Sequence, residues 1–277
     1  MSIWNAVFFG LVQGLTEFFP VSSSAHLAAL GNLFGIESGG FNFKLFTVFL
    51  HLGTIISLII VLWNDLADMV YEVLLMVNAR TNPRYRQKHY PNARLLMMLG
   101  VSTLPLFLLL LVNNYINRLY TNNIIMGVML ILSGTILFVA DRFTGTKKLT
   151  NSMTMSDALI IGLCQLVAII PGISRIATAT TAGYSVGLKK DFALKYALLL
   201  SLPTSFGAAI IHIINASSGS FAWSDVPVCL VGMVTALLTG IFSLRVMLSL
   251  GEKAKFNGFS YYSWVAGVLF IILTMIF

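Results

Sequence analysis

The sequence predicts an all-α integral membrane protein with six transmembrane helices and two re-entrant helix hairpins, arranged as an inverted-topology repeat. Of its 277 residues, 57% are hydrophobic and 10% are charged, whereas soluble domains carry about 25% charged residues. The apolar runs are continuous over about twenty residues, which fits helices rather than the alternating segments of membrane barrels. Two further apolar regions are interrupted at their centres by Pro, Ser and Gly.

Six segments are long and apolar enough to cross a bilayer. They cover residues 44–63, 95–112, 124–140, 196–214, 228–244 and 260–277. The two interrupted regions cover residues 2–41 and 156–188, and each is predicted to form a pair of half-length helices joined at membrane depth. Broken backbone at that depth is tolerated only where protein or a wet cavity surrounds it. The breaks therefore predict a buried site.

The distribution of basic residues indicates the membrane topology of these segments. Suppose that each interrupted region enters and leaves on one side and that each long segment crosses once. All Lys and Arg except Lys44, Arg118 and Arg175 then share one face, in the connections 64–94, 141–155, 189–195 and 245–259. Such an excess marks the cytoplasmic side, so both termini are predicted to be external. The net charge of +7 thus reflects orientation, and no nucleic-acid partner is expected.

Weak similarity relates a first half, residues 1–150, to a second half, residues 151–277. At a constant offset of 152, Ala6, Gly10, Gln13, Ser22, Gly31 and Gly35 match Ala158, Gly162, Gln165, Ser174, Gly183 and Gly187. In this topology the two halves have opposite orientations in the membrane, with the first hairpin entering from outside and the second from the cytoplasm. Such repeats place a binding site near the midplane, where the helix breaks meet. Chance similarity between sequences rich in Gly and Ala is the alternative interpretation.

The first break reads QGLTEFFPVSSSAH. Gln13 and Glu17 lie four residues apart and therefore share one helix face. Pro20 ends that helix, and the following serines begin the next one, whose first N–H groups are left free for an anion. His26 lies one turn further along. An ionisable group at bilayer depth costs at least roughly 2.5–3.5 kcal/mol, so Glu17 needs a partner or a function.

The second break reads PGISRIATATT and has the same design, with Arg175 added at the helix start. A guanidinium offers a fixed fork of donors that suits phosphate oxygens. Together with the hydroxyls and the helix starts, it favours a phosphate or diphosphate ligand. Glu17 would repel that ligand unless it is protonated or binds a divalent metal shared with the phosphates. A purely structural ion pair between Glu17 and Arg175 is the alternative.

Both breaks resemble the signature motifs of the undecaprenyl-diphosphatase family, also called the bacitracin-resistance family. The likeness also includes the segment FTVFLHLGT and covers nearly the whole chain. It implies an enzyme of the bacterial inner (plasma) membrane that removes the terminal phosphate of undecaprenyl diphosphate at a pocket opening to the outer face. It further implies a divalent cation (Mg or Ca) as cofactor and a polyprenyl diphosphate lipid as partner, with a homodimer as an option.

The resemblance also assigns roles to individual residues of the two breaks. It implies catalytic roles for Glu17, Ser23, His26 and Arg175, with the choice of nucleophile between Ser23 and His26 left open. Phosphate-binding roles fall on Ser22, Ser24, Ser174, Arg175 and Thr178, supporting roles on Gln13 and His51, and the metal on Glu17. From its position near Gly53, His51 is equally compatible with lining a cavity and with a structural role.

Three positions depart from the family pattern. The expected run Pro-Gly-x-Ser-Arg-Ser-x-x-Thr has Ile176 and Ala179 in place of its second Ser and its Thr, and Ala25 replaces a usual Gly. Thr178 and Thr180 flank the altered position but point about 100° away on a helix. Each missing hydroxyl could remove roughly 1–3 kcal/mol of anion stabilisation. A polyprenyl-phosphate transporter or flippase, and a weakened or inactive homologue, are therefore the alternatives to the phosphatase.

Overall fold

The structure, a computed structural model, describes residues 1–36, 43–78, 89–111, 122–143, 147–216, 223–253 and 256–276. It is helical nearly throughout: α1 (Ile3–Phe18), α2 (Ser23–Leu33), α3 (Phe43–Val61), α4 (Trp63–Asn78), α5 (Pro91–Thr103), η3 (Leu104–Leu111), α7 (Asn123–Ala140), α8 (Met155–Gln165), η4 (Leu166–Ile169), α9 (Arg175–Ser185), α10 (Lys190–Ala216), η5 (Trp223–Asp225), α11 (Val226–Lys253) and α12 (Asn257–Ile276). Six of these helical segments are long and apolar enough to cross a membrane. The all-α membrane class and the six spans are thus confirmed.

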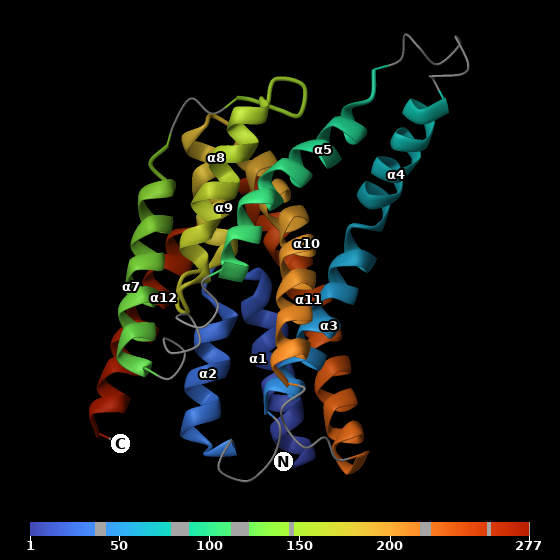
Figure 1. Ribbon diagram of the computed structural model, residues 1–277. Coiled ribbons are helices and arrows are strands. Elements are labelled where there is room, and N and C mark those ends of the chain that lie inside the picture. The colour runs from blue at the N-terminus through green and yellow to red at the C-terminus, as the bar shows by residue number, and fades with distance from the viewer. Residues whose placement is uncertain are drawn as a thin grey trace.

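The two interrupted regions form two pairs of short helices (Figure 1). The helices α1 and α2 run antiparallel at the end of the molecule where the N-terminus lies. The helices α8 and α9 form the second pair at the opposite end, and the turns of both pairs meet at mid-height (Figure 1). How deeply each pair enters a bilayer stays a prediction.

The connection after the first span is partly helical, although the sequence predicts a loop there. The helix α3 passes at Leu62 into α4, and the Leu66 N–H donates to the Leu62 carbonyl over 3.0 Å. The acidic residues of α4, Asp65, Asp68 and Glu72, stand three and four positions apart, which is helical spacing. Glu72 among them accepts from the N–H groups of Asn92 and Ala93 over 2.6 and 3.0 Å and so fixes the start of α5.

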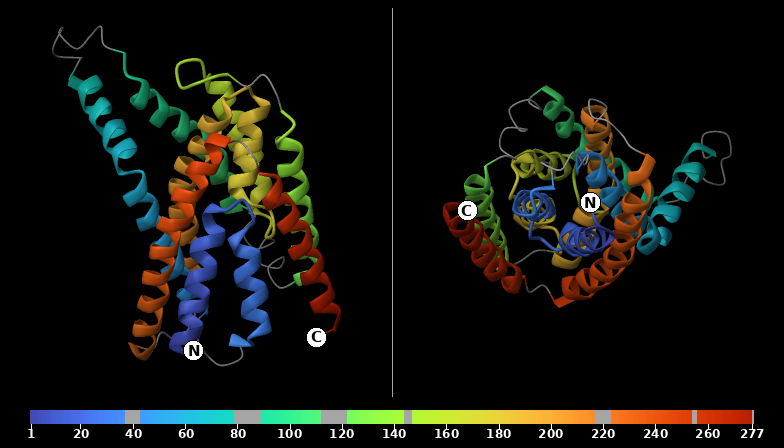
Figure 2. Two further views of the ribbon diagram at one scale, coloured as in Figure 1. Left: turned by 180° about the vertical axis from the view of Figure 1, so that it is seen from behind. Right: turned by 90° about the horizontal axis from the view of Figure 1, so that it is seen from below.

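The described parts of the basic connections gather at one end of the molecule, opposite the two termini (Figure 1). The starts of α5, α8, α10 and α12 and the ends of α7, α9 and α11 lie there (Figures 1 and 2). Ion pairs join the neighbouring elements: Lys148 to Asp157 at 3.0 Å and Lys195 to Asp65 at 2.6 Å. Residues 79–88, Arg118 and Lys255 lie outside the described residues.

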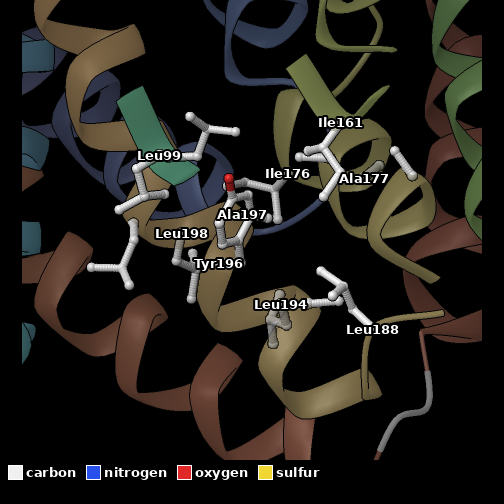
Figure 3. Close-up of a cluster of buried hydrophobic side chains, with 14 of the residues drawn as sticks. Leu99, Ile161, Ile176, Ala177, Leu188, Leu194, Tyr196, Ala197 and Leu198 are labelled. Atoms are coloured by element: carbon white, nitrogen blue, oxygen red, sulfur yellow. The ribbon is translucent and has the colours of Figure 1, made fainter. Parts of the chain in front are cut away.

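The largest hydrophobic cluster packs α9 against α5, α8 and α10 (Figure 3). Within it, the Ser102 hydroxyl bonds both the Ala158 carbonyl and the Tyr196 hydroxyl over 2.6 Å. Gly162 allows the close contact between α8 and α5, since a Cβ there would meet the backbone of Ser102. This core fixes the position of α9, whose first residue is Arg175.

Candidate active site

The turn between α1 and α2 sets the geometry of the first break. Pro20 lacks the N–H that would continue α1, so the helix ends at Phe18. Ser22 then adopts φ +64°, a left-handed conformation that costs a non-glycine residue about 1–2 kcal/mol. Strain of this kind persists only where the surroundings impose it, and it gathers at functional sites. Here it starts α2 directly at Ser23 and turns that residue back toward Glu17.

The Glu17 carboxylate is buried at the centre of the site and joins the two breaks. Arg175 Nη2 donates to its Oε1 over 2.8 Å, and the Ser23 hydroxyl donates to its Oε2 over 2.5 Å. The Ser205 hydroxyl on α10 also donates to Oε1, over 3.1 Å. Hydrogen bonds to a charged group are the stronger kind, and here they offset the cost of burying the carboxylate.

Gln13 and His51 support the carboxylate from α1 and α3. Gln13 Nε2 donates to Glu17 Oε2 over 3.1 Å and lies 3.0 Å from Nδ1 of His51. The amide nitrogen can only donate, so His51 accepts through Nδ1 and carries its proton on Nε2 when neutral. The same Nδ1 lies 3.8 Å from Glu17 Oε2. His51 therefore lies at the site, as one of its two interpretations requires.

The start of α9 is anchored before it reaches the site. The Ser174 hydroxyl accepts from the N–H of Ala177 over 3.3 Å and so caps the helix. The Ser174 N–H donates to the hydroxyl of Ser133 on α7 over 3.0 Å. The Thr178 hydroxyl donates to the Ser174 carbonyl over 2.8 Å, which leaves it no hydrogen for a phosphate oxygen in this arrangement. The Ser174 hydroxyl, which accepts, keeps its hydrogen for a ligand.

The start of α2 has no such cap. The Ser22 side chain makes no capping bond to the backbone and instead lies 3.2 Å from the Ser24 hydroxyl. The first N–H groups of α2 are therefore not occupied by their cap residue, and two hydroxyls stand beside them. An uncapped helix start with adjacent hydroxyls is a favourable place for an anion.

His26 is held away from Ser23 by two other partners. Its Nδ1 lies 2.8 Å from the Ser22 carbonyl, and its Nε2 lies 2.8 Å from the hydroxyl of Tyr262 on α12. Ser23 and His26 are three residues apart on α2, so both side chains lie on one face about one turn apart. The imidazole can therefore serve a group bound at Ser23 without bonding the Ser23 hydroxyl itself.

A divalent cation fits this site only together with phosphate. Among the described residues no group of three His, Cys, Asp or Glu could hold a metal ion. Oε1 of Gln13, however, is buried without a hydrogen-bond partner beside the Glu17 carboxylate. One carboxylate and one amide oxygen, completed by substrate phosphates, are a usual donor set for Mg²⁺.

The positions that depart from the family pattern do not face the site. Ile176 and Ala179 are buried in the cluster that packs α9 against its neighbours (Figure 3 shows Ile176 beside Ile161 and Ala177). Ala25 is fully buried against Met126 and Leu130 of α7. The apolar side chains are thus accommodated by packing, while Arg175 keeps its contact with Glu17.

Three contributors were missed by sequence reasoning: Ser133, Ser205 and Tyr262. Each comes from a long span and reaches the breaks from the side. A signal existed for one of them, because Pro203 interrupts the hydrogen bonding of α10 two residues before Ser205. The other two lie in apolar segments without any comparable mark.

Fold and site together define a polytopic helical membrane protein in which two pairs of short helices share one buried acid–guanidinium site. The family model described as bacitracin resistance protein BacA matches residues 6–269, and the chain belongs to this family. The resemblance seen in the sequence is thus confirmed.

Relatives named undecaprenyl-diphosphatase match the chain over nearly its whole length. The protein from Halothermothrix orenii is 32% identical over 100% of both chains. The one from Methanobrevibacter smithii is 34% identical over 97% of this chain and 96% of its own. The one from Desulforapulum autotrophicum is 34% identical over 98% of both.

Proposed function

We propose that this protein is a membrane phosphatase that hydrolyses undecaprenyl diphosphate to undecaprenyl phosphate and inorganic phosphate. Family membership and the names of the relatives support the reaction. The observation that carries it is the 2.5 Å hydrogen bond from the Ser23 hydroxyl to Glu17, beside the guanidinium of Arg175. A hydroxyl next to its base and next to a phosphate-binding cation is what phosphoryl transfer requires.

In the first step, Ser23 Oγ attacks the terminal phosphorus while Glu17 takes up the hydroxyl proton. An Oγ–P bond forms, the P–O bond of the anhydride breaks, and undecaprenyl phosphate leaves. Arg175 moves part of its hydrogen bonding from Glu17 to the phosphate oxygens, which makes the carboxylate more available to the proton. The uncapped start of α2 adds N–H donors for the charge that develops on those oxygens.

In the second step, water attacks the phosphoserine and His26 accepts the water proton. The new O–P bond forms, the Oγ–P bond breaks, and the Glu17 proton returns to Ser23 Oγ. Inorganic phosphate is then released, and His26 gives the water proton to solvent, which restores the starting state. The one-turn separation of His26 from Ser23 supports these separate roles for the two side chains.

A divalent cation would be held by Glu17 and by the free Oε1 of Gln13 together with the phosphates. When bound, it neutralises diphosphate charge that a single Arg does not balance. Arg175 and the Ser174 hydroxyl remain the chain's own phosphate donors.

The proposed setting is the bacterial plasma membrane, with the basic end in the cytoplasm and both termini outside. The positive-inside rule supports this orientation. Two inverted repeats, 1–150 and 151–277, would place α1–α2 as a hairpin open to the outside and α8–α9 as its cytoplasmic counterpart. In support, Gly10 packs α1 closely against α11 and its match Gly162 packs α8 closely against α5, the corresponding span.

The test is phosphate release from undecaprenyl diphosphate by purified protein in lipid nanodiscs, with and without Mg²⁺ or Ca²⁺. Arg175→Ala should abolish release, and Arg142→Ala, a control at the basic end, should not. The proposal would be overturned if Arg175→Ala released phosphate as fast as the wild type under every metal condition. Acid-stable phosphate on Ser23 after quenching supports the serine step, and acid-labile phosphate on His26 contradicts it.

A further inference from the structure

Tyr262 connects His26 to a span that is distant in the sequence. It lies on α12, 236 positions along the chain, and its hydroxyl stands 2.8 Å from Nε2 of His26. The two rings also stack, with 11° between their planes and 5.7 Å between their centroids. A hydrogen bond combined with stacking fixes both the position and the rotation of the imidazole. No sequence motif assigns Tyr262 to the site.

The partners of His26 also fix its proton. Nδ1 faces the Ser22 carbonyl, which can only accept, so Nδ1 carries a hydrogen in either charge state. In the neutral imidazole, Nε2 is therefore a lone pair that accepts from the Tyr262 hydroxyl. In the imidazolium, Nε2 donates to the same oxygen, because a phenol hydroxyl can donate or accept. The Tyr262 hydroxyl can therefore bond either charge state of His26, but in the neutral imidazole it occupies the lone pair of Nε2, which must be released before that atom can accept a proton from water.

The contact between Tyr262 and His26 can be opened by movement of a side chain. His26 itself is 6% exposed and is covered by Tyr262 and by the edge of Phe270, both on α12. Tyr262 is 47% exposed, so its ring can turn outward without disturbing the core. Movement of one side chain is therefore enough to open Nε2 to a water molecule at the phosphate.

We propose that Tyr262 is a positioning residue of the hydrolytic step: it holds the His26 ring, whose Nδ1 keeps its hydrogen on the Ser22 carbonyl, so that Nε2 can accept a proton from water once the Tyr262 hydroxyl turns away. The proposal rests on the proposed function for its catalytic consequence. Its structural part, the control of His26 by Tyr262, stands apart from catalysis and can be measured without substrate.

The adjacent tyrosine supplies a matched control. Tyr261 packs against Phe138 and Trp264, on a different face of α12 from the one that meets His26. Tyr261→Phe and Tyr262→Phe remove the same oxygen from neighbouring positions, and both keep the aromatic ring. A general effect on α12 should appear in both variants, and an effect through His26 in only one.

The first measurement is steady-state hydrolysis of undecaprenyl diphosphate. Tyr262→Phe should lower kcat about tenfold with little change in KM, as expected for a hydrogen bond that serves the chemical step. Tyr261→Phe should keep both constants. Equal kcat in the wild type and Tyr262→Phe, or an equal loss in both variants, overturns the catalytic part of the proposal.

The second measurement is acylation of histidines by diethylpyrocarbonate, followed by mass spectrometry of the full protein's peptides. Exposed His89 normalises the reagent, and buried His51 reports general loosening. Tyr262→Phe should raise the acylation rate at His26 roughly fivefold and leave the rate at His51 unchanged. A fivefold change in an equilibrium constant corresponds to the loss of one hydrogen bond of about 1 kcal/mol. An unchanged rate at His26, or a parallel rise at His51, overturns the proposal. Failure of hydrolysis in the wild type overturns only the proposed function.

Discussion

Arg175 donates to the carboxylate of Glu17 over 2.8 Å although the two residues lie 158 positions apart, each beside the turn of a different helix pair. Their exposures differ: 3% of the Glu17 side chain and 26% of the Arg175 side chain are accessible. The guanidinium thus spans from the buried carboxylate toward the open side of the site. A ligand can reach its remaining donors without first breaking the ion pair, because a guanidinium carries five of them.

Replacement of Arg175 by Lys should show that the shape of the donor matters as well as its charge. The lysine keeps one positive charge but cannot hold Glu17 and a phosphate oxygen in the same fork. We expect kcat to fall by roughly 10²–10³, as for loss of one preorganised donor to a developing charge. Phosphate release from undecaprenyl diphosphate measures it, with Arg142→Lys as control. Full activity of Arg175→Lys would show that a point charge is sufficient.

Replacement of Ser205 by Ala should weaken the site from a helix that carries no motif. The variant removes one hydrogen bond to Glu17 Oε1 and leaves Arg175 in place. We expect a loss of about 1 kcal/mol in the free energy of activation, or roughly fivefold in kcat. Ser201→Ala is the matched control, since that hydroxyl lies one turn earlier on α10 and bonds the Leu198 carbonyl. Equal effects of the two substitutions would contradict a role for Ser205 in the site.

Restoring the family's serine at position 176 should not improve the enzyme. Ile176 is 2% exposed within the cluster that fixes α9, so a serine there would leave a cavity and a buried hydroxyl. We expect Ile176→Ser to lower stability by about 2–4 kcal/mol and to leave kcat no higher than in the wild type. Thermal unfolding in nanodiscs and phosphate release measure the two effects. Ile176→Val, which removes one methylene without adding a hydroxyl, should cost about 1 kcal/mol. A higher kcat in Ile176→Ser would mean that this position does face the phosphate.

The sequence was sufficient for the spans and for the meeting of the two breaks. Continuous apolar runs carry the spans, and the offset of 152 places Ser23 opposite Arg175, which identifies the segments that now share Glu17. It failed where the answer depends on how helices rotate and pack. The face of α9 that carries Ile176 could not be assigned to the core without knowing that α5, α8 and α10 cover it.

Contacts from remote spans also could not be predicted from the local sequence pattern. Ser205 and Tyr262 reach the site because α10 and α12 lie beside the turns, and neither position differs in type from many that only pack. The sequence prediction placed the residues of α4 in the connection 64–94, whereas in the structure they form a helix from which Glu72 fixes the start of α5.

Ionisation of Asp141, just beyond the end of α7, should make the folded protein less stable as the pH rises from acid to neutral. Burial raises the pKa of its carboxyl above the ordinary range, although the Phe256 N–H and the charge of Lys190 lower it in part. The folded chain therefore binds this proton more tightly than the unfolded chain does. Stability from this group is fully present below the ordinary pKa of about 3.9 and is lost as pH rises through the folded-state value.

Asp141→Asn removes the charge and keeps an oxygen that can accept from the Phe256 N–H, 2.9 Å away in the wild type. We expect the thermal midpoint at pH 7 to rise by a few degrees at most, and the difference between pH 4 and pH 7 to shrink relative to the wild type. Asp157→Asn should act in the opposite direction, because it removes the charge that pairs with Lys148 at 3.0 Å. If Asp141→Asn instead lowers the midpoint at pH 7, the carboxylate stabilises the junction of α7 and α12 more than its burial costs.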